Sequence, residues 1–124
     1  MRYLIIILLA IALASCGGKK PEPISYSAKI QPILNEHCVS CHNADRAEGK
    51  IVLTSYDALM ASRISPGKKP LLIPGDHMKS WLYILSSTNQ AHYRMPPDTA
   101  SQALLPKEKV ALIAQWIQQG AANN

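Results

Sequence analysis

Phenylalanine is absent from this 124-residue chain, and other large aromatic side chains are few. Two tryptophans and five tyrosines bring the aromatic fraction to 6%, so the chain has little with which to fill a core of its own. The formal net charge of +5 is too modest to indicate nucleic acid binding. The longest apolar run, from Leu4 to Leu13, is too short for a helix that spans a bilayer. No internal repeat is present, so the composition indicates one small domain.

Cysteine is also scarce, with three residues in the chain, but two of them stand close together. They lie in the run Cys38-Val39-Ser40-Cys41-His42, whose C-x-x-C-H pattern is typical of covalent attachment of c-type haem. Two thiols at this spacing can each add to a vinyl group of one porphyrin, and the adjacent imidazole then lies beneath the iron. We therefore predict one covalently bound haem c, attached through Cys38 and Cys41, with His42 as an iron ligand.

Three other interpretations of the pair of cysteines remain open: a thiol redox pair, half of a zinc site and a structural disulfide. A thioredoxin-like pair would be surrounded by a βαβ pattern, which is missing here. A zinc finger or ribbon needs a second ligand pair, but the only other histidines are His37, His77 and His92, and no cysteine follows Cys41. A disulfide between Cys38 and Cys41 would close a very small loop. The sequence favours haem over all three.

The N-terminal 15 residues are typical of a secretion signal, with the positive Arg2 followed by the apolar run Leu4 to Leu13. The run ends in Leu13-Ala14-Ser15-Cys16, which resembles the lipobox of bacterial lipoproteins. This resemblance implies cleavage before Cys16 and a diacylglyceryl group on its sulfur. The alternative is an ordinary signal peptide with an incidental cysteine, which would leave a reactive thiol in an exported protein.

The expected domain organisation follows from this cleavage site. Residues 1–15 are the predicted lipoprotein signal peptide, residues 16–23 a lipidated tether and residues 24–121 the folded domain. Removing 15 of the 124 residues leaves 109, enough for one small domain. Several acyl chains hold a protein on a membrane far more firmly than one. We therefore expect an exported protein that is lipid-anchored to a bacterial membrane and faces the periplasm.

The hydrophobic pattern predicts an all-α domain of short helices and loops. We expect helices over residues 28–37, 56–62, 76–85 and 107–119, with Thr54 or Ser55 and Asp76 as N-caps. In the third of these helices, Met78 and Trp81 are expected on one apolar face. Residues 51–53 are extended at most, and residues 63–69 are a loop. Residues 70–75, bracketed by prolines, are expected to pack against the haem or against the core.

A sixth ligand for the iron is expected from Met95. The two prolines after it restrict Met95 to an extended conformation and stiffen the loop that presents its sulfur. The alternatives are His92, Met78 or no protein ligand, while Met60, Met78, His77 and His92 are adequately explained by packing or by a surface position. Ligation by His42 and Met95 would raise the reduction potential and block small molecules from the iron.

Two sets of basic residues have a functional and an ordinary interpretation. Arg94, beside the predicted ligand, can pair with a haem propionate or be a solvated arginine. Lys68, Lys69 and Lys79 can form a docking patch for an acidic partner or an ordinary solvated surface.

Several short motifs, taken in order, resemble the small class I cytochrome c domain of the planctomycete type. The resemblance covers about residues 24–121 and implies an all-α cytochrome c fold, one haem c ligated by His42 and Met95, and electron transfer. Such domains often occur fused to larger oxidoreductases, whereas this one stands alone. The matching residues are Cys38 to His42, Pro74-Gly75-Asp76, Ser80, Met95-Pro96-Pro97, Trp116-Ile117 and Gly120-Ala121.

The sequence thus predicts a membrane-anchored monohaem c-type cytochrome that exchanges electrons with redox partner proteins. It is expected to be an electron carrier rather than an enzyme, and no nucleic acid partner is expected. The alternative function is the haem c subunit of an enzyme, or a gas-binding haem sensor, with a labile sixth ligand.

Overall fold

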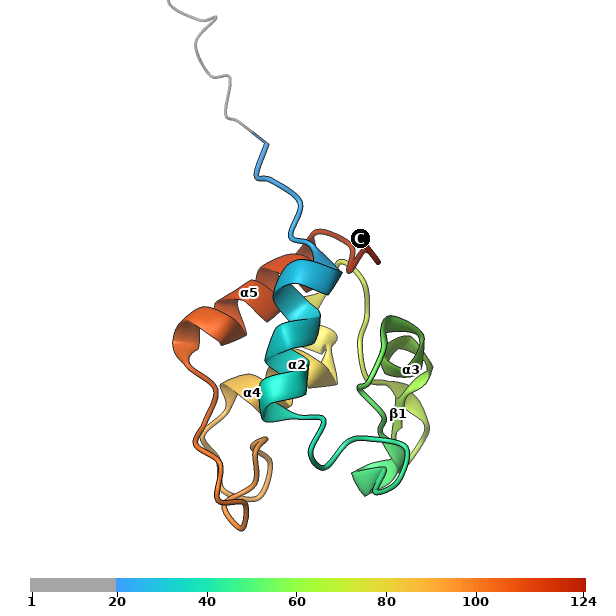
Figure 1. The fold of residues 1–124 in the computed structure, drawn as a ribbon, viewed down its shortest axis with the longest axis vertical. Coiled ribbons are helices and arrows are strands. Elements are labelled where there is room, and N and C mark those ends of the chain that lie inside the picture. The colour runs from blue at the N-terminus through green and yellow to red at the C-terminus, as the bar shows by residue number, and fades with distance from the viewer. Residues whose placement is uncertain (1–19) are drawn as a thin grey trace, which may run out of the picture.

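The computed structural model describes residues 20–124, which form short helices joined by long loops around a small core (Figure 1). This arrangement confirms the all-α prediction. The helical elements are η1 (Tyr26–Ile30), α2 (Gln31–His37), η2 (Glu48–Lys50), α3 (Tyr56–Ala61), η3 (His77–Lys79), α4 (Trp81–Ser87) and α5 (Lys107–Gln118), and the strands are β1 (Arg63–Ile64) and β2 (Lys69–Pro70).

The first helical rod combines the π-helical turn η1 with α2, so it runs without interruption from Tyr26 to His37. Ser25 caps its start, because the Ser25 hydroxyl accepts a hydrogen bond from the Ala28 N–H. Pro32 lies in the first turn of α2, directly after the π-helical turn. The rod begins two residues before the predicted residue 28 and ends at the predicted His37.

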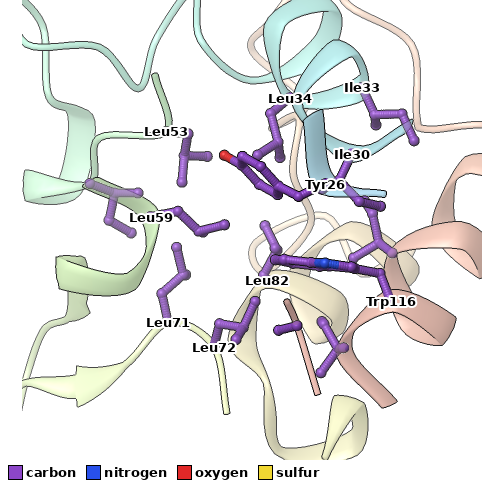
Figure 2. Close-up of a cluster of buried hydrophobic side chains, with 14 of the residues drawn as sticks. Tyr26, Ile30, Ile33, Leu34, Leu53, Leu59, Leu71, Leu72, Leu82 and Trp116 are labelled. Carbon is purple, nitrogen blue, oxygen red and sulfur yellow. The ribbon is translucent and has the colours of Figure 1, made fainter. Parts of the chain in front are cut away.

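The core lies where this rod meets α4 and α5 (Figure 2). Trp116 of α5 is 1% exposed and packs against the Tyr26 ring with 5.4 Å between ring centroids. Tyr56 of α3 meets the Tyr26 ring edge-on at 5.2 Å. Aliphatic side chains fill the remaining space. They include Ile30, Leu34, Leu59, Leu72, Ile113 and Ile117.

The segment between Asp76 and Ser87 differs from the single helix predicted for residues 76–85. Asp76 does act as a cap, but only for the 3₁₀ turn η3, and α4 begins after a break at Ser80. The buried Ser80 hydroxyl donates to the Asp76 carbonyl oxygen at 2.8 Å and accepts from the Ile73 N–H at 2.9 Å, which holds the break. As a result Met78 is 66% exposed, so the prediction that it lies on the apolar face is wrong.

A small hairpin occupies residues 63–70, where the sequence predicted only a loop. Strands β1 and β2 pair antiparallel, with Arg63 opposite Pro70 and Ile64 opposite Lys69. Residues 51–53 are irregular, as the sequence allowed, with Ile51 and Leu53 buried. Two-residue strands leave no hydrophobic alternation in a sequence, which is why the pattern missed them.

The predicted signal peptide and Cys16 lie outside the described residues. Between residues 20 and 124, no helix is long and apolar enough to cross a membrane.

Candidate functional site

The Cys38–His42 run leaves the C-terminal end of α2 as a series of tight turns. The Cys38 N–H donates to the Leu34 carbonyl oxygen at 2.8 Å, which continues the helical pattern for one more residue. The N–H groups of Cys41 and His42 both donate to the Cys38 carbonyl oxygen, at 3.1 and 3.0 Å. These bonds coil the backbone so that His42 borders two adjoining hollows, with Cys41 bordering the larger and Cys38 the smaller.

Both cysteines are free, half-buried thiols. Burial, with a smaller contribution from the charge of Cys41, raises the pKa of Cys38 to about 12. A redox pair needs a thiolate at neutral pH, because the thiolate is the nucleophile in disulfide exchange. The environment of Cys38 therefore disfavours the dithiol interpretation, and an uncharged sulfur facing an apolar space suits a thioether.

The orientation of the His42 ring is fixed by a hydrogen bond with the main chain. Its Nδ1 atom lies 3.0 Å from the Glu48 carbonyl oxygen. Because a carbonyl oxygen only accepts, we assign the proton to Nδ1, which leaves the lone pair on Nε2. A neutral imidazole held in this tautomer is prepared to bind a metal through Nε2, and such outer bonds to ring N–H groups are typical of metal-ligating histidines.

The loop that supplies this carbonyl is organised by one side chain, Asn43. Its amide oxygen accepts from the N–H groups of Asp45 and Arg46, both at 3.0 Å, and its amide NH₂ donates to the Val39 carbonyl oxygen at 2.8 Å. Gly49 then adopts a φ of +64°, a conformation that suits glycine. The loop returns the chain so that the Glu48 carbonyl faces the His42 ring.

The site itself is a cavity of about 790 Å³, within the ~300–1,000 Å³ typical of small-molecule and cofactor sites. A smaller apolar hollow adjoins it, and His42 and Met95 line both spaces. The larger space has a polar rim, as a macrocycle with wet propionates requires, and apolar side chains lie deeper. The lining includes Ser40, Cys41, Arg46, Ile51, Ile64, Leu85, Thr99 and Gln102 in the larger space, and Cys38, Leu53, Leu71, Leu82 and Ser86 in the smaller.

Met95 reaches the cavity from the long loop between α4 and α5. Its N–H donates to the Leu85 carbonyl oxygen at 2.8 Å, so the main chain fixes the residue independently of its side chain. Met95 is 37% exposed, and Pro96, which follows it, is buried. The structure therefore brings the predicted ligands His42 and Met95 to one space from segments that lie far apart in the sequence.

The Arg94 side chain is largely shielded from water and already has an acidic partner in the same loop. Its side chain is 16% exposed and forms an ion pair with Asp98 across the loop. This pair closes the segment that carries Met95.

The other candidate ligands lie away from the cavity. Met78 and His92 are exposed and are not among the lining residues, and Met60 packs against the core. His77 packs edge-on against the Tyr83 ring at 4.9 Å.

The three lysines of the suggested docking patch are exposed. Lys79 forms an ion pair with Asp76 at 2.9 Å, which raises the pKa of Lys79 and lowers that of Asp76. The position of Lys68 and Lys69 at the β1–β2 hairpin is compatible with an ordinary solvated surface.

The residues of the cavity fit a haem group better than a zinc ion. Zinc sites are held by three or four protein ligands, whereas no three His, Cys, Asp or Glu residues between positions 20 and 124 are grouped to hold a metal ion. An imidazole, a thioether and two free thiols around a cofactor-sized apolar space match what haem c needs.

Two features of the site were not predicted from the sequence. The Glu48 carbonyl is a main-chain group and has no signature in the sequence. Asn43, followed by Asp45, could have been identified as an Asx turn, because asparagine side chains commonly accept from the N–H two residues on.

Comparison with known proteins gives one match. A family model described as planctomycete cytochrome C matches residues 38–99, half of the 124-residue chain. The matched stretch begins at Cys38 and includes His42 and Met95. No curated protein and no solved structure matches the chain.

Proposed function

The chain belongs to the planctomycete cytochrome C family, and we propose that it is a monohaem electron carrier with His42 and Met95 as iron ligands, held on a membrane by a lipid at Cys16. Family membership identifies a haem-binding electron-transfer protein and implies covalently bound haem c. The number of haems, the ligands and the anchor are the proposal.

One observation carries the proposal: His42 and Met95 line the same two adjoining spaces, with Cys38 bordering one and Cys41 the other. This is the set of groups that a haem c with two axial protein ligands requires. Apolar side chains line the smaller space, and the larger space has polar groups at its rim.

Each of these residues has a distinct proposed role. Cys38 and Cys41 would hold the macrocycle through thioether bonds, and the Glu48 carbonyl keeps His42 in the tautomer that leaves the Nε2 lone pair for the iron. Met95 would supply a soft sulfur as the second protein ligand, which would favour the reduced state and exclude small molecules. When bound, the haem supplies one-electron chemistry through its iron. No bond is made or broken by the protein, so no residue is assigned a catalytic role.

The direct test of this function is the attachment and stoichiometry of the haem. We expect the purified protein to remain red after extraction with acidified acetone, because thioether bonds survive conditions that remove non-covalent haem. The spectrum in alkaline pyridine is expected to give one haem per chain with two saturated vinyl groups. Colour that passes into the acetone, or a stoichiometry far from one, would contradict the proposed attachment through both cysteines.

The lipid anchor is tested separately at Cys16. We expect the Cys16→Ser variant to move from the membrane fraction to the soluble fraction of the periplasm while staying red, because the haem is attached elsewhere. The measurement is the haem absorbance of each fraction, and Ser15→Ala, which keeps the cysteine and a small residue before it, is the matched control. Retention of the Cys16→Ser variant in the membrane would count against the anchor.

A further inference from the structure

The point where the tether joins the domain is fixed to the C-terminal end of α5. The Gln119 side-chain oxygen accepts from the Ile24 N–H at 2.7 Å, and its NH₂ group donates to the Glu22 carbonyl oxygen at 3.1 Å. The Asn124 side-chain oxygen accepts from the Tyr26 N–H at 2.9 Å. These bonds hold the chain from residue 22 onward against one end of the domain, beside the C-terminus (Figure 1).

The cavity lies at the other end of the same helical rod. From Tyr26 to His37 the rod contains five residues of η1 and seven of α2. At about 1.5 Å of rise per residue, these twelve residues place the start of the rod roughly 18 Å from the end that delivers the Cys38–His42 run. Every residue that lines the larger cavity falls between positions 40 and 102, and the loops that carry them lie at the end of the domain away from the tether (Figure 1).

The tether is short relative to this distance. Six residue spacings separate Cys16 from Glu22, so even a fully extended chain reaches no more than about 22 Å. A relaxed flexible chain of this length spans only about 13 Å. To bring the cavity against the bilayer, the tether would have to run fully extended past the whole rod, at a cost in conformational entropy.

We infer that the anchored protein presents its cavity away from the bilayer, so that its redox partner is reached from the aqueous phase and not from within the membrane. This inference rests on the proposed lipid at Cys16. The partner is accordingly a water-soluble redox protein, or a redox domain that extends well above the membrane.

The orientation can be measured by photo-cross-linking of the full lipidated holoprotein to lipid headgroups. The probe is phosphatidylethanolamine that carries a benzophenone on its headgroup, mixed into phosphatidylcholine vesicles. Cleavage after Arg94, Lys107 and Lys109 yields peptides 95–107, from the cavity loop, and 110–124, from the tether end. After illumination of protein that floats with the vesicles, we expect several-fold more lipid adducts on peptide 110–124 than on peptide 95–107.

A variant with a longer tether is the matched control. Inserting 20 glycine and serine residues between Gly18 and Lys19 adds a reach of about 25 Å, enough for the domain to turn over. The adduct ratio between the two peptides is expected to fall toward one in this variant. Equal labelling of both peptides in the floating native protein would overturn the orientation while leaving the anchor intact. Failure of the protein to float would overturn the anchor, and the orientation with it.

Discussion

Replacing Met95 with alanine is expected to lower the reduction potential by at least about 0.1 V, a modest part of the roughly 0.8 V over which axial ligands set haem potentials. Thioether ligation stabilises the reduced iron and gives a weak band near the red end of the ferric spectrum. Both effects should disappear with the Met95 sulfur. The measurements are the ferric spectrum, a redox titration and the binding of carbon monoxide to the reduced protein. The native protein should show no carbon monoxide binding, whereas the variant should bind it readily.

The fold of this variant should survive, so the spectral changes can be attributed to the ligand. The Met95 N–H bond to the Leu85 carbonyl oxygen does not involve the side chain, and the Arg94–Asp98 pair that closes the loop is retained. The helical circular dichroism should therefore match the native protein. The haem should also stay, because the bonds to Cys38 and Cys41 do not depend on Met95.

Met78→Ala provides the control for Met95→Ala. It removes the same side chain from a position that is 66% exposed and outside the cavity lining, so we expect no change in potential, spectrum or carbon monoxide binding. If Met78→Ala alone abolishes the band, the ligand assignment is wrong. If neither substitution has an effect, His92 becomes the leading candidate and His92→Ala is the next variant to measure. If the unmodified protein already binds carbon monoxide, the gas-binding function is favoured over electron transfer.

The helices that the sequence predicted well are those with local start and stop signals. Pro106 and Gly120 bracket α5, whose bounds of Lys107–Gln118 differ from the prediction by one residue. Ser55 caps α3 at the predicted position, with its hydroxyl accepting from the Ala58 N–H. Such signals act within a few residues, so they can be identified without knowledge of the fold.

The segment after Asp76 shows what local signals could not provide. Its apolar spacing predicted one helix through residue 85, but the Ser80 side chain bonds to main-chain groups of Ile73 and Asp76 and breaks the helix. Serine inside a helical pattern is compatible with either outcome, and burial of Ser80 against the preceding loop decided it. The exposure of Met78 is a consequence of that break.

The site was predictable to the extent that its chemistry resides in side chains. The spacing within the Cys38–His42 run predicts the attachment point, and the prolines after Met95 predict a stiff loop. The structure adds that His42 and Met95 line one cavity, and that the Glu48 carbonyl sets the His42 tautomer. Both additions depend on how distant loops close on each other, which one sequence does not encode in a recognisable pattern.

Replacing both Cys38 and Cys41 with alanine is expected to leave a largely unfolded chain when no haem is bound. A cavity of about 790 Å³ separates the loops of the site, and any part of it that stays closed to water without haem destabilises the fold by roughly 24 cal/mol per Å³. If only a quarter of that volume stayed empty, the cost would be about 5 kcal/mol, comparable to the whole stability of a small domain. The measurements are far-ultraviolet circular dichroism and thermal unfolding, in which most of the helical signal and the cooperative transition should be lost.

The single variant Cys41→Ala is the matched control for this experiment. It removes a thiol of the same site but keeps the attachment through Cys38, so it should remain red and helical with a lower unfolding temperature. A haem stabilises only the folded state, so the difference between the single and double variants reports what the bound cofactor contributes. Trp116, Tyr26 and Tyr56 pack against one another and do not line the cavity, so this aromatic part of the core does not depend on contact with the haem. A haem-free double variant that stays helical and melts cooperatively would show that this core holds the fold without the cofactor, which would refute the prediction.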